Sequence, residues 1–233
     1  MKYGKKAHKR FGDIASRRQE VVRVKAKKHS TSSKKWLERQ LNDPYVTAAK
    51  KEGFRSRAAF KLIELNDQFH LLSSGLRVVD LGAAPGGWSQ VVAIAIGPKG
   101  KLIALDILAM NPIPKVEILH LDFMSDDAPD KLKVALQGSA DLVLSDLAPS
   151  TTGHTRTDHI RIMAMAEAAA LFATEILAPG GAFVCKFFQG GAEKQLLEQL
   201  KRDFAKVKHA KPPASRAESS ETYLVAQGFR KTK

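Results

Sequence analysis

From residue 76 onward, short apolar runs alternate with longer segments in which apolar residues recur every three or four positions. The short runs are rich in Val, Ile and Leu, which predicts buried strands at 76–81, 101–106, 116–121, 141–145 and 181–188. The longer segments have the spacing of amphipathic helices and cover 87–96, 127–136, 158–177 and 191–204. This alternation predicts an α/β fold, in which a mainly parallel sheet carries helices on both faces.

Both ends of the chain depart from the alternation. Only a short segment separates the last apolar run, Glu221–Gln227, from Val207, and it is too short for a helical crossover. We therefore expect the final pair of strands to be antiparallel. On the N-terminal side, Ser56 is placed to cap a helix that runs to about Phe69, and an interrupted helix is expected over 36–51.

Length and composition bound the protein class. With 233 residues and 44% hydrophobic content, the chain can bury one full α/β core and a tail. No apolar run approaches the roughly 20 residues of a membrane span, and no hydrophobic segment follows the N-terminal charges, so we expect neither a membrane protein nor a secretory signal. The single cysteine, Cys185, excludes an internal disulfide and fits the cytoplasm. Because it lies in an apolar run, we interpret it as a core residue rather than a nucleophile.

The positive charge is concentrated at the N-terminus. The formal net charge is +14, and residues 1–40 contain 14 Lys or Arg against three acids, a net charge of +11. This basic segment could be a solvated tail or a segment that binds a membrane surface. However, such an excess of positive charge without an apolar face favours binding to a polyanion such as RNA. We expect residues 1–35 to form a flexible, basic, RNA-binding arm and residues 36–233 to form one domain.

The stretch from Asp80 to Gln90, DLGAAPGGWSQ, joins a predicted strand to a predicted helix through a turn rich in glycine. Its spacing, Gly-x-x-x-Gly-Gly from Gly82 to Gly87, differs from the Gly-x-Gly-x-x-Gly of dinucleotide sites, and Pro85 removes an N–H that a phosphate would use. A ligand with adenosine and an amino acid but no phosphate suits this turn, which indicates S-adenosylmethionine. The alternative is an ordinary glycine-rich turn.

Three acids stand at the ends of predicted strands, at the edge where such a ligand would bind. Asp106, 24 residues after Gly82, is placed to accept hydrogen bonds from ribose hydroxyls, and Asp122 from the adenine amine. Helix capping is the alternative for both. Asp146 follows the fourth strand at the same edge, and the residues after it, Leu147–Pro149, offer no aromatic ring to stack a base. The methyl acceptor is therefore predicted to be an oxygen rather than a base nitrogen.

Lys186 is the most unusual charge in the sequence, because it lies within an apolar strand where a lysine needs a partner or a route to solvent. Taken alone, Lys61 reads as an exposed helix lysine and Glu221 as a charge at the start of an edge strand. The seven histidines show no metal-ligand spacing, so no metal site is predicted.

Together these sequence segments resemble those of the FtsJ/RrmJ family of ribosomal RNA 2′-O-ribose methyltransferases. The resemblance rests on residues 56–62, 78–90, 104–108, 121–123, 145–153, 184–190 and 215–226. It implies a seven-stranded methyltransferase sheet with an antiparallel last strand. The catalytic tetrad implied is Lys61, Asp146, Lys186 and Glu221. The implied S-adenosylmethionine contacts are Gly82, Ala83, Pro85, Gly86, Gly87, Trp88, Asp106, Ile107, Asp122 and Asp146.

The resemblance also implies a substrate: a uridine in the A loop of 23S rRNA, in the large ribosomal subunit. We expect a monomeric enzyme in which Lys186 acts either as a base or as a cation that steers the ribose hydroxyl. Two alternatives remain: another RNA substrate, such as tRNA or a cap, and a non-enzymatic assembly factor that binds S-adenosylmethionine. The chain departs from the family in its longer basic arm and in Glu218 and Ser220, which stand where basic residues are expected.

Overall fold

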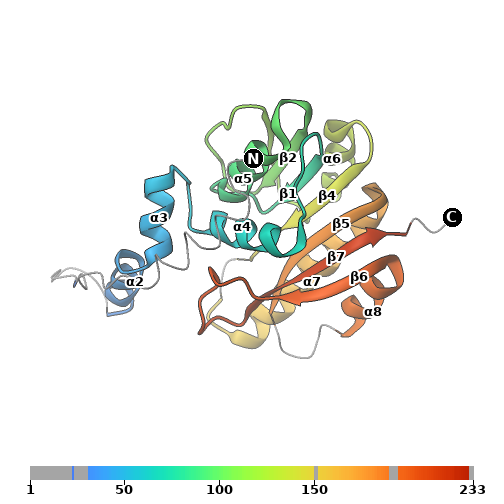
Figure 1. The fold of residues 1–233 in the computed structure, drawn as a ribbon. Helices are drawn as coiled ribbons and strands as arrows, with labels where there is room; N and C mark the ends of the chain where they lie inside the picture. Colours follow the sequence, from blue (N-terminus) through green and yellow to red (C-terminus); the bar gives the residue numbers. More distant parts are fainter. Residues whose placement is uncertain (1–22, 24–30, 150–151, 189–193, 231–233) are drawn as a thin grey trace.

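The computed structural model describes residues 23, 31–149, 152–188 and 194–230, and its centre is a seven-stranded sheet (Figure 1). The strands are β1 (Arg77–Leu81), β2 (Lys101–Asp106), β3 (Val116–His120), β4 (Ala140–Ser145), β5 (Leu177–Phe188), β6 (Phe204–Ala210) and β7 (Glu221–Phe229). Their order is β3-β2-β1-β4-β5-β7-β6, parallel from β3 to β5 and antiparallel from β5 through β7 to β6. The predicted fold class and the antiparallel final pair are both confirmed.

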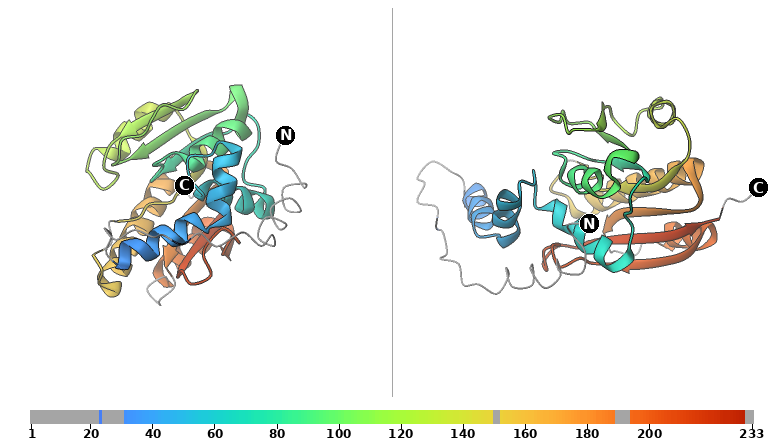
Figure 2. Two further views of the ribbon diagram at one scale, coloured as in Figure 1. Left: turned by 90° about the vertical axis from the view of Figure 1, so that its left-hand side faces the viewer. Right: turned by 45° about the horizontal axis from the view of Figure 1, so that its top comes forward.

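The helices cover both faces of this sheet. They are α2 (Thr31–Leu41), α3 (Pro44–Glu52), α4 (Ala58–Phe69), α5 (Gly87–Ile96), α6 (Ala128–Leu136), α7 (Thr155–Ile176) and α8 (Lys194–Asp203), with a 3-10 turn η1 at Gly97–Lys99. Residues of α6, α7 and α8 pack on one face, and those of α4 and α5 on the other. Helices α2 and α3 extend from the α4 side, away from the sheet (Figure 2). No helix within the described ranges has both the length and the apolar character to cross a membrane.

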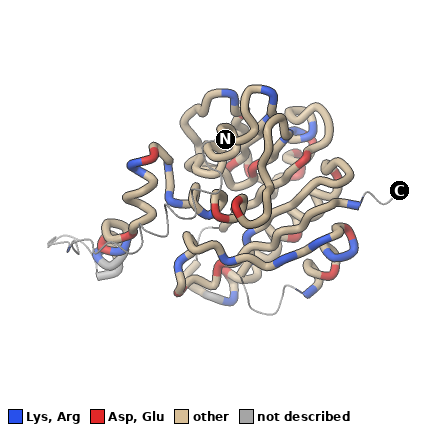
Figure 3. The backbone as a smooth tube through the Cα atoms, viewed as in Figure 1, with Lys and Arg blue, Asp and Glu red and all other residues tan. Residues whose placement is uncertain are grey.

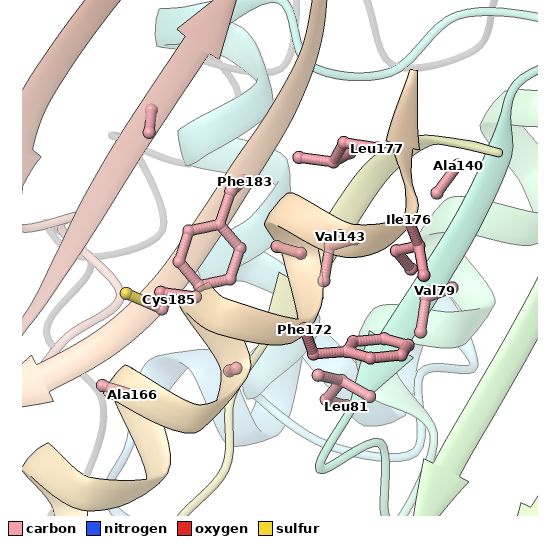
Figure 4. Packing of buried hydrophobic residues seen from close by; sticks show 14 of the residues in the cluster. Val79, Leu81, Ala140, Val143, Ala166, Phe172, Ile176, Leu177, Phe183 and Cys185 are labelled. Carbon is pink, nitrogen blue, oxygen red and sulfur yellow. The ribbon is translucent and has the colours of Figure 1, made fainter. Parts of the chain in front are cut away.

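The core follows the two-residue period of the strands. Val79 and Leu81 of β1 pack with Val143 and Phe183 against α7, as Figure 4 shows, whereas Val78 packs on the opposite face. Cys185 is fully buried in the α7 cluster, where burial raises the pKa of its thiol to about 12. The prediction that this cysteine is a core residue is confirmed.

Two helix starts show where local sequence rules hold and where they fail. Asp43 caps α3, because its Oδ1 accepts the Tyr45 N–H at 3.0 Å and Pro44 occupies the first turn, so the predicted interruption is confirmed. The prediction that Ser56 caps α4 is wrong. The helix begins at Ala58, and the Ser56 hydroxyl is buried without a hydrogen-bond partner. Ser56 packs against Gly87 so closely that a Cβ added to Gly87 would lie 2.4 Å from Ser56 Oγ.

The predicted basic arm lies almost entirely outside the described residues. Its last five positions, 31–35, belong to α2, which therefore runs across the boundary expected after residue 35.

Candidate active site

Four charged side chains, far apart in sequence, meet at the rim of the sheet on the face covered by α4. Strand alternation explains the convergence: Lys186 lies two residues after Val184 of that face, and Glu221 two residues before Tyr223. Asp146 directly follows β4, and Lys61 comes from the first turns of α4. The structure thus brings together all four predicted catalytic residues.

The four side chains form two ion pairs. Lys61 Nζ lies 2.7 Å from Glu221 Oε1 and 2.8 Å from Oε2. Lys186 Nζ lies 2.9 Å from Asp146 Oδ1 and donates to the Asp146 carbonyl oxygen at 2.7 Å. The Lys186 side chain is only 8% exposed, so the Asp146 oxygens supply the partners that a lysine in an apolar strand requires.

Tyr223 connects the two pairs, and the sequence analysis did not identify it. Its hydroxyl donates to Asp146 Oδ1 at 3.1 Å, and Lys61 Nζ lies 5.9 Å from its ring centroid. Burial, reinforced by the charges of Asp146 and Glu221, raises the pKa of Tyr223 well above its ordinary value, so the phenol stays protonated and donates. Its position two residues after Glu221, hence on the same strand face, was a signal that could have found it.

A cavity of about 580 Å³ opens beside Asp146 at the carboxyl ends of β1, β2 and β4. Its lining includes five of the predicted cofactor contacts, namely Gly82, Asp106, Ile107, Asp122 and Asp146. Apolar side chains such as Leu105, Phe123 and Met165 form much of the rest, and Arg161 of α7 lies at the wall. Met165 and Arg161 are four residues apart on α7 and so share one helix face, a pattern that sequence alone could have indicated.

Two of the three acids predicted to contact the cofactor, Asp106 and Asp122, also organise the backbone around the cavity. Asp106 accepts the Ala84 N–H through Oδ2 and the Leu108 N–H through Oδ1, both at 2.8 Å. Asp122 Oδ1 accepts the Met124 N–H at 2.9 Å. Both carboxylates can therefore stabilise a local turn and still bind a ligand in the cavity, because each carboxylate oxygen can accept more than one hydrogen bond.

The glycine turn is shaped largely by close contacts with neighbouring segments. A Cβ on Gly82, whose φ is +76°, would lie 2.7 Å from the Leu147 backbone nitrogen, so the turn approaches the segment after β4 very closely. Five predicted contacts are not among the residues lining the 580 Å³ cavity: Ala83, Pro85, Gly86, Gly87 and Trp88. Trp88 is buried instead, and its indole N–H donates to the Ala58 carbonyl at 2.8 Å.

Asp80, the first residue of the motif, is a fully buried acid next to the site. Its Oδ2 accepts the Ser89 hydroxyl at 2.6 Å, whereas Oδ1 has no hydrogen-bond partner. Burial raises the pKa of Asp80 to about 7, opposed by the Ser89 hydrogen bond and reinforced by the charges of Asp146 and Asp106.

Among the described residues, no group of three or more His, Cys, Asp or Glu side chains is arranged to hold a metal ion.

The chain is similar to proteins of known family. A model of the FtsJ-like methyltransferase family matches residues 54–229, which include all four converging side chains. Ribosomal RNA large subunit methyltransferase E of Paramagnetospirillum magneticum is 58% identical over 225 residues, 94% of this chain and 92% of that protein. The protein of the same name from Azorhizobium caulinodans is 59% identical over 213 residues, 90% and 89% of the two chains. A crystal structure from Plasmodium falciparum, assigned as a ribosomal RNA methyltransferase, superposes with a TM-score of 0.68 at 32% identity, covering 76% of this chain and 98% of that one.

Proposed function

This chain belongs to the FtsJ-like methyltransferase family, and from that premise we propose that it transfers a methyl group from S-adenosylmethionine to a ribose 2′-oxygen of large-subunit ribosomal RNA. The specific acceptor proposed is a uridine in the A loop of 23S rRNA. The observation that carries the proposal is the meeting of the Lys61–Glu221 and Lys186–Asp146 pairs next to a cavity whose wall includes Asp146. A protein that only bound a cofactor would have no need of these four converging charges.

The 580 Å³ cavity suits S-adenosylmethionine in both size and chemistry. Asp106 and Asp122 retain acceptor capacity for the ribose hydroxyls and the adenine amine, and the apolar walls can enclose the flat base. When bound, S-adenosylmethionine would supply an electrophilic methyl group whose bond to the positively charged sulfur breaks as the carbon–oxygen bond forms, so that the sulfur leaves as a neutral thioether. Asp146 belongs both to this wall and to the Lys186 pair, so it marks where the methyl group and the acceptor would meet.

Lys186 is proposed to hold the acceptor oxygen. Its two described partners, Asp146 Oδ1 and the Asp146 carbonyl, are both acceptors, and an ammonium has three N–H donors. The third donor is then available to a ribose 2′-oxygen, which it would orient toward the methyl group. Such positioning alone supplies several kcal/mol, about 7–11 in the best intramolecular cases.

The hydroxyl proton is proposed to pass to the Asp146 carboxylate. A hydroxyl becomes acidic as its oxygen forms the new bond to carbon, so a weak base at short range is sufficient. Tyr223 and Lys186 both contact Oδ1 of this carboxylate. Lys61 with Glu221 lies next to Tyr223, where both can contact the ribose or its neighbours.

The direct test is transfer of labelled methyl groups to ribosomal particles that lack the modification. Large subunits and 23S rRNA from a strain without the enzyme should accept label, and mapping should place it on a 2′-oxygen in the A loop. Label appearing instead in tRNA or capped RNA would show that another RNA is the substrate. Binding of S-adenosylmethionine without transfer to any RNA would favour the non-enzymatic assembly factor.

We also propose that residues 1–35 act as an RNA-binding arm on a methyltransferase domain formed by residues 36–233, in a monomer that works where ribosomes are, in the cytoplasm. The support is the net charge of +11 in residues 1–40. Deletion of residues 1–30, which spares α2, should weaken RNA binding and flatten its salt dependence. An unchanged salt slope would refute a role for the arm.

A further inference from the structure

Arg55 connects two walls of the 580 Å³ cavity, although it does not itself line that cavity. Lys and Arg positions are spread over many helices and strands (Figure 3), so the contacts of each side chain distinguish its part. Arg55 lies in the turn between α3 and α4. Its Nη1 donates to the carbonyl oxygens of Pro85 at 3.2 Å and Asn111 at 2.7 Å, and its Nη2 donates to that of Pro112 at 2.8 Å. The side chain thus joins the glycine turn to the post-β2 segment, which we define as residues 107–115.

Both of these segments form part of the cavity wall. Gly82 and Ala84 line it from the glycine turn, and Ile107 and Leu108 line it from the post-β2 segment. On the cavity side, Asp106 already links the two, because its carboxylate accepts the N–H groups of Ala84 and Leu108. The guanidinium makes a second link between the same two segments, from outside the cavity.

Close packing accompanies the hydrogen bonds. Gly86 has a φ of +108°, and a Cβ added there would lie 2.9 Å from Ile113 Cδ1 and 3.0 Å from Arg55 Nη1. Ile113, near the end of the post-β2 segment, is buried. The glycine turn, the arginine and the segment are therefore in direct contact, and neither wall can move far without displacing this side chain.

Arg55 is itself held in place by the helix that follows the glycine turn. Its backbone N–H donates to Gln90 Oε1 at 2.8 Å, and Gln90 Nε2 donates to the Gly53 carbonyl at 3.1 Å. Gln90 belongs to α5, which begins at Gly87. Because a guanidinium is a planar fork with several donors, one arginine reaches three carbonyls in a geometry that a lysine ammonium cannot reproduce.

We infer that Arg55 is a positioning residue for the cofactor, which keeps the two walls at the separation that the cofactor requires. The inference rests on the proposed function, since S-adenosylmethionine is taken as the ligand of the cavity. This ligand has an amino acid at one end and adenosine at the other, so it needs both walls at once. Without Arg55, the post-β2 segment would have to be ordered on binding, and that ordering lowers affinity.

The test measures S-adenosylmethionine binding to the full chain by calorimetry, without RNA. Arg55→Ala removes hydrogen bonds from a charged donor and should raise the Kd about tenfold. Arg55→Lys keeps the charge but not the fork, so its Kd should rise less. The matched control is Arg77→Ala at the opposite end of β1, where Nε donates to the Ser139 carbonyl at 3.0 Å and Nη2 to the Leu136 carbonyl. It also loses bonds to carbonyls and should leave the Kd unchanged.

Steady-state kinetics separate positioning of the cofactor from a general loss of structure. In Arg55→Ala the KM for S-adenosylmethionine should rise, whereas kcat at saturating cofactor should stay within about twofold of the wild type, because Arg55 does not touch the reacting atoms. A variant that only folded less completely would show a lower kcat with an unchanged KM. RNA affinity measured without cofactor should match the wild type.

Three outcomes would overturn the inference. The first is an unchanged Kd in both Arg55 variants, and the second is an equal rise in Arg77→Ala. The third is weaker RNA binding with unchanged cofactor affinity, which would assign Arg55 to RNA instead. Wild-type protein that binds S-adenosylmethionine but methylates no RNA would refute the proposed function, while the calorimetric comparison would still decide the role of Arg55.

Discussion

The two faces of the sheet bury different kinds of side chain. On the face covered by α6, α7 and α8, the buried ionisable group among the described residues is the Cys185 thiol, whose raised pKa keeps it neutral. On the opposite face, covered by α4 and α5, Asp80, Lys186 and Tyr223 are all buried. Each of these three has a polar partner: Ser89, Asp146 and Asp146 again.

This difference between the two faces predicts which substitutions change stability and which change catalysis. A buried charge without a partner costs several kcal/mol, so ionisable groups are tolerated only where the fold supplies partners. Here the partners are Asp146, which directly follows β4, and Ser89 of α5. Substitutions on the apolar face should therefore change the free energy of unfolding, and substitutions at the rim should change methyl transfer.

The largest effect is expected at Lys186. Lys186→Ala removes the group proposed to hold the 2′-oxygen, so methyl transfer measured at saturating RNA should fall by about 10²–10³-fold. Binding of S-adenosylmethionine, measured by calorimetry, should persist. Lys101→Ala, at the start of β2, is the matched lysine control and should leave transfer unchanged. Near-normal turnover of Lys186→Ala would refute the assigned role.

At Phe183, on the apolar face, a substitution should lower stability without lowering methyl transfer. This side chain is fully buried in the α7 cluster, so Phe183→Ala should lower the free energy of unfolding by about 3–5 kcal/mol in denaturant titration. Phe183→Leu keeps most of the volume and should cost less than about 1.5 kcal/mol. The folded fraction of either variant should retain methyl transfer. A large loss of turnover per folded molecule would break the separation between the two faces.

Gly82 tests the contact between the glycine turn and the segment after β4. Gly82 and Gly53 both have φ of +76°, but only Gly82 has backbone within 3 Å of where a Cβ would lie. Gly53→Ala should cost about 1–2 kcal/mol of backbone strain. Gly82→Ala adds overpacking of about 1–3 kcal/mol and should also weaken S-adenosylmethionine binding. Equal losses of stability for the two variants would show that the close approach carries no cost.

Asp80 is expected to make the free energy of unfolding depend on pH. Because its pKa in the folded protein is about 7, above the unfolded value of about 3.9, the folded state holds an extra proton between these pH values. The Asp80 contribution to the free energy of unfolding therefore decreases as pH rises from about 4 to 7, and then stays constant. Asparagine does not titrate, so Asp80→Asn lacks this pH-dependent decrease. The free energy of unfolding of the variant relative to the wild type should therefore increase as pH rises from about 4 to 7. A difference that does not vary with pH would contradict the raised pKa.

Much of the fold was predictable because local periodicity reports burial. The strands β1, β2, β3 and β4 lie within a residue of the predicted runs, and α5 matches its predicted range. The error at Ser56 has a tertiary cause: Gly87 packs against that serine, and α4 begins one residue later than the capping rule predicts. Neighbours from another element decided this helix start.

The sequence by itself determined the alternating elements, the sheet class and the four charges of the family resemblance, because these depend on residue type and spacing along the chain. Only the tertiary structure decided which charges pair. It also decided that Tyr223 joins the two pairs, and that Asp43 contacts both Arg57 and Arg216. Such contacts join residues up to 173 positions apart, and their geometry depends on how the helices pack on the sheet, which no local pattern encodes.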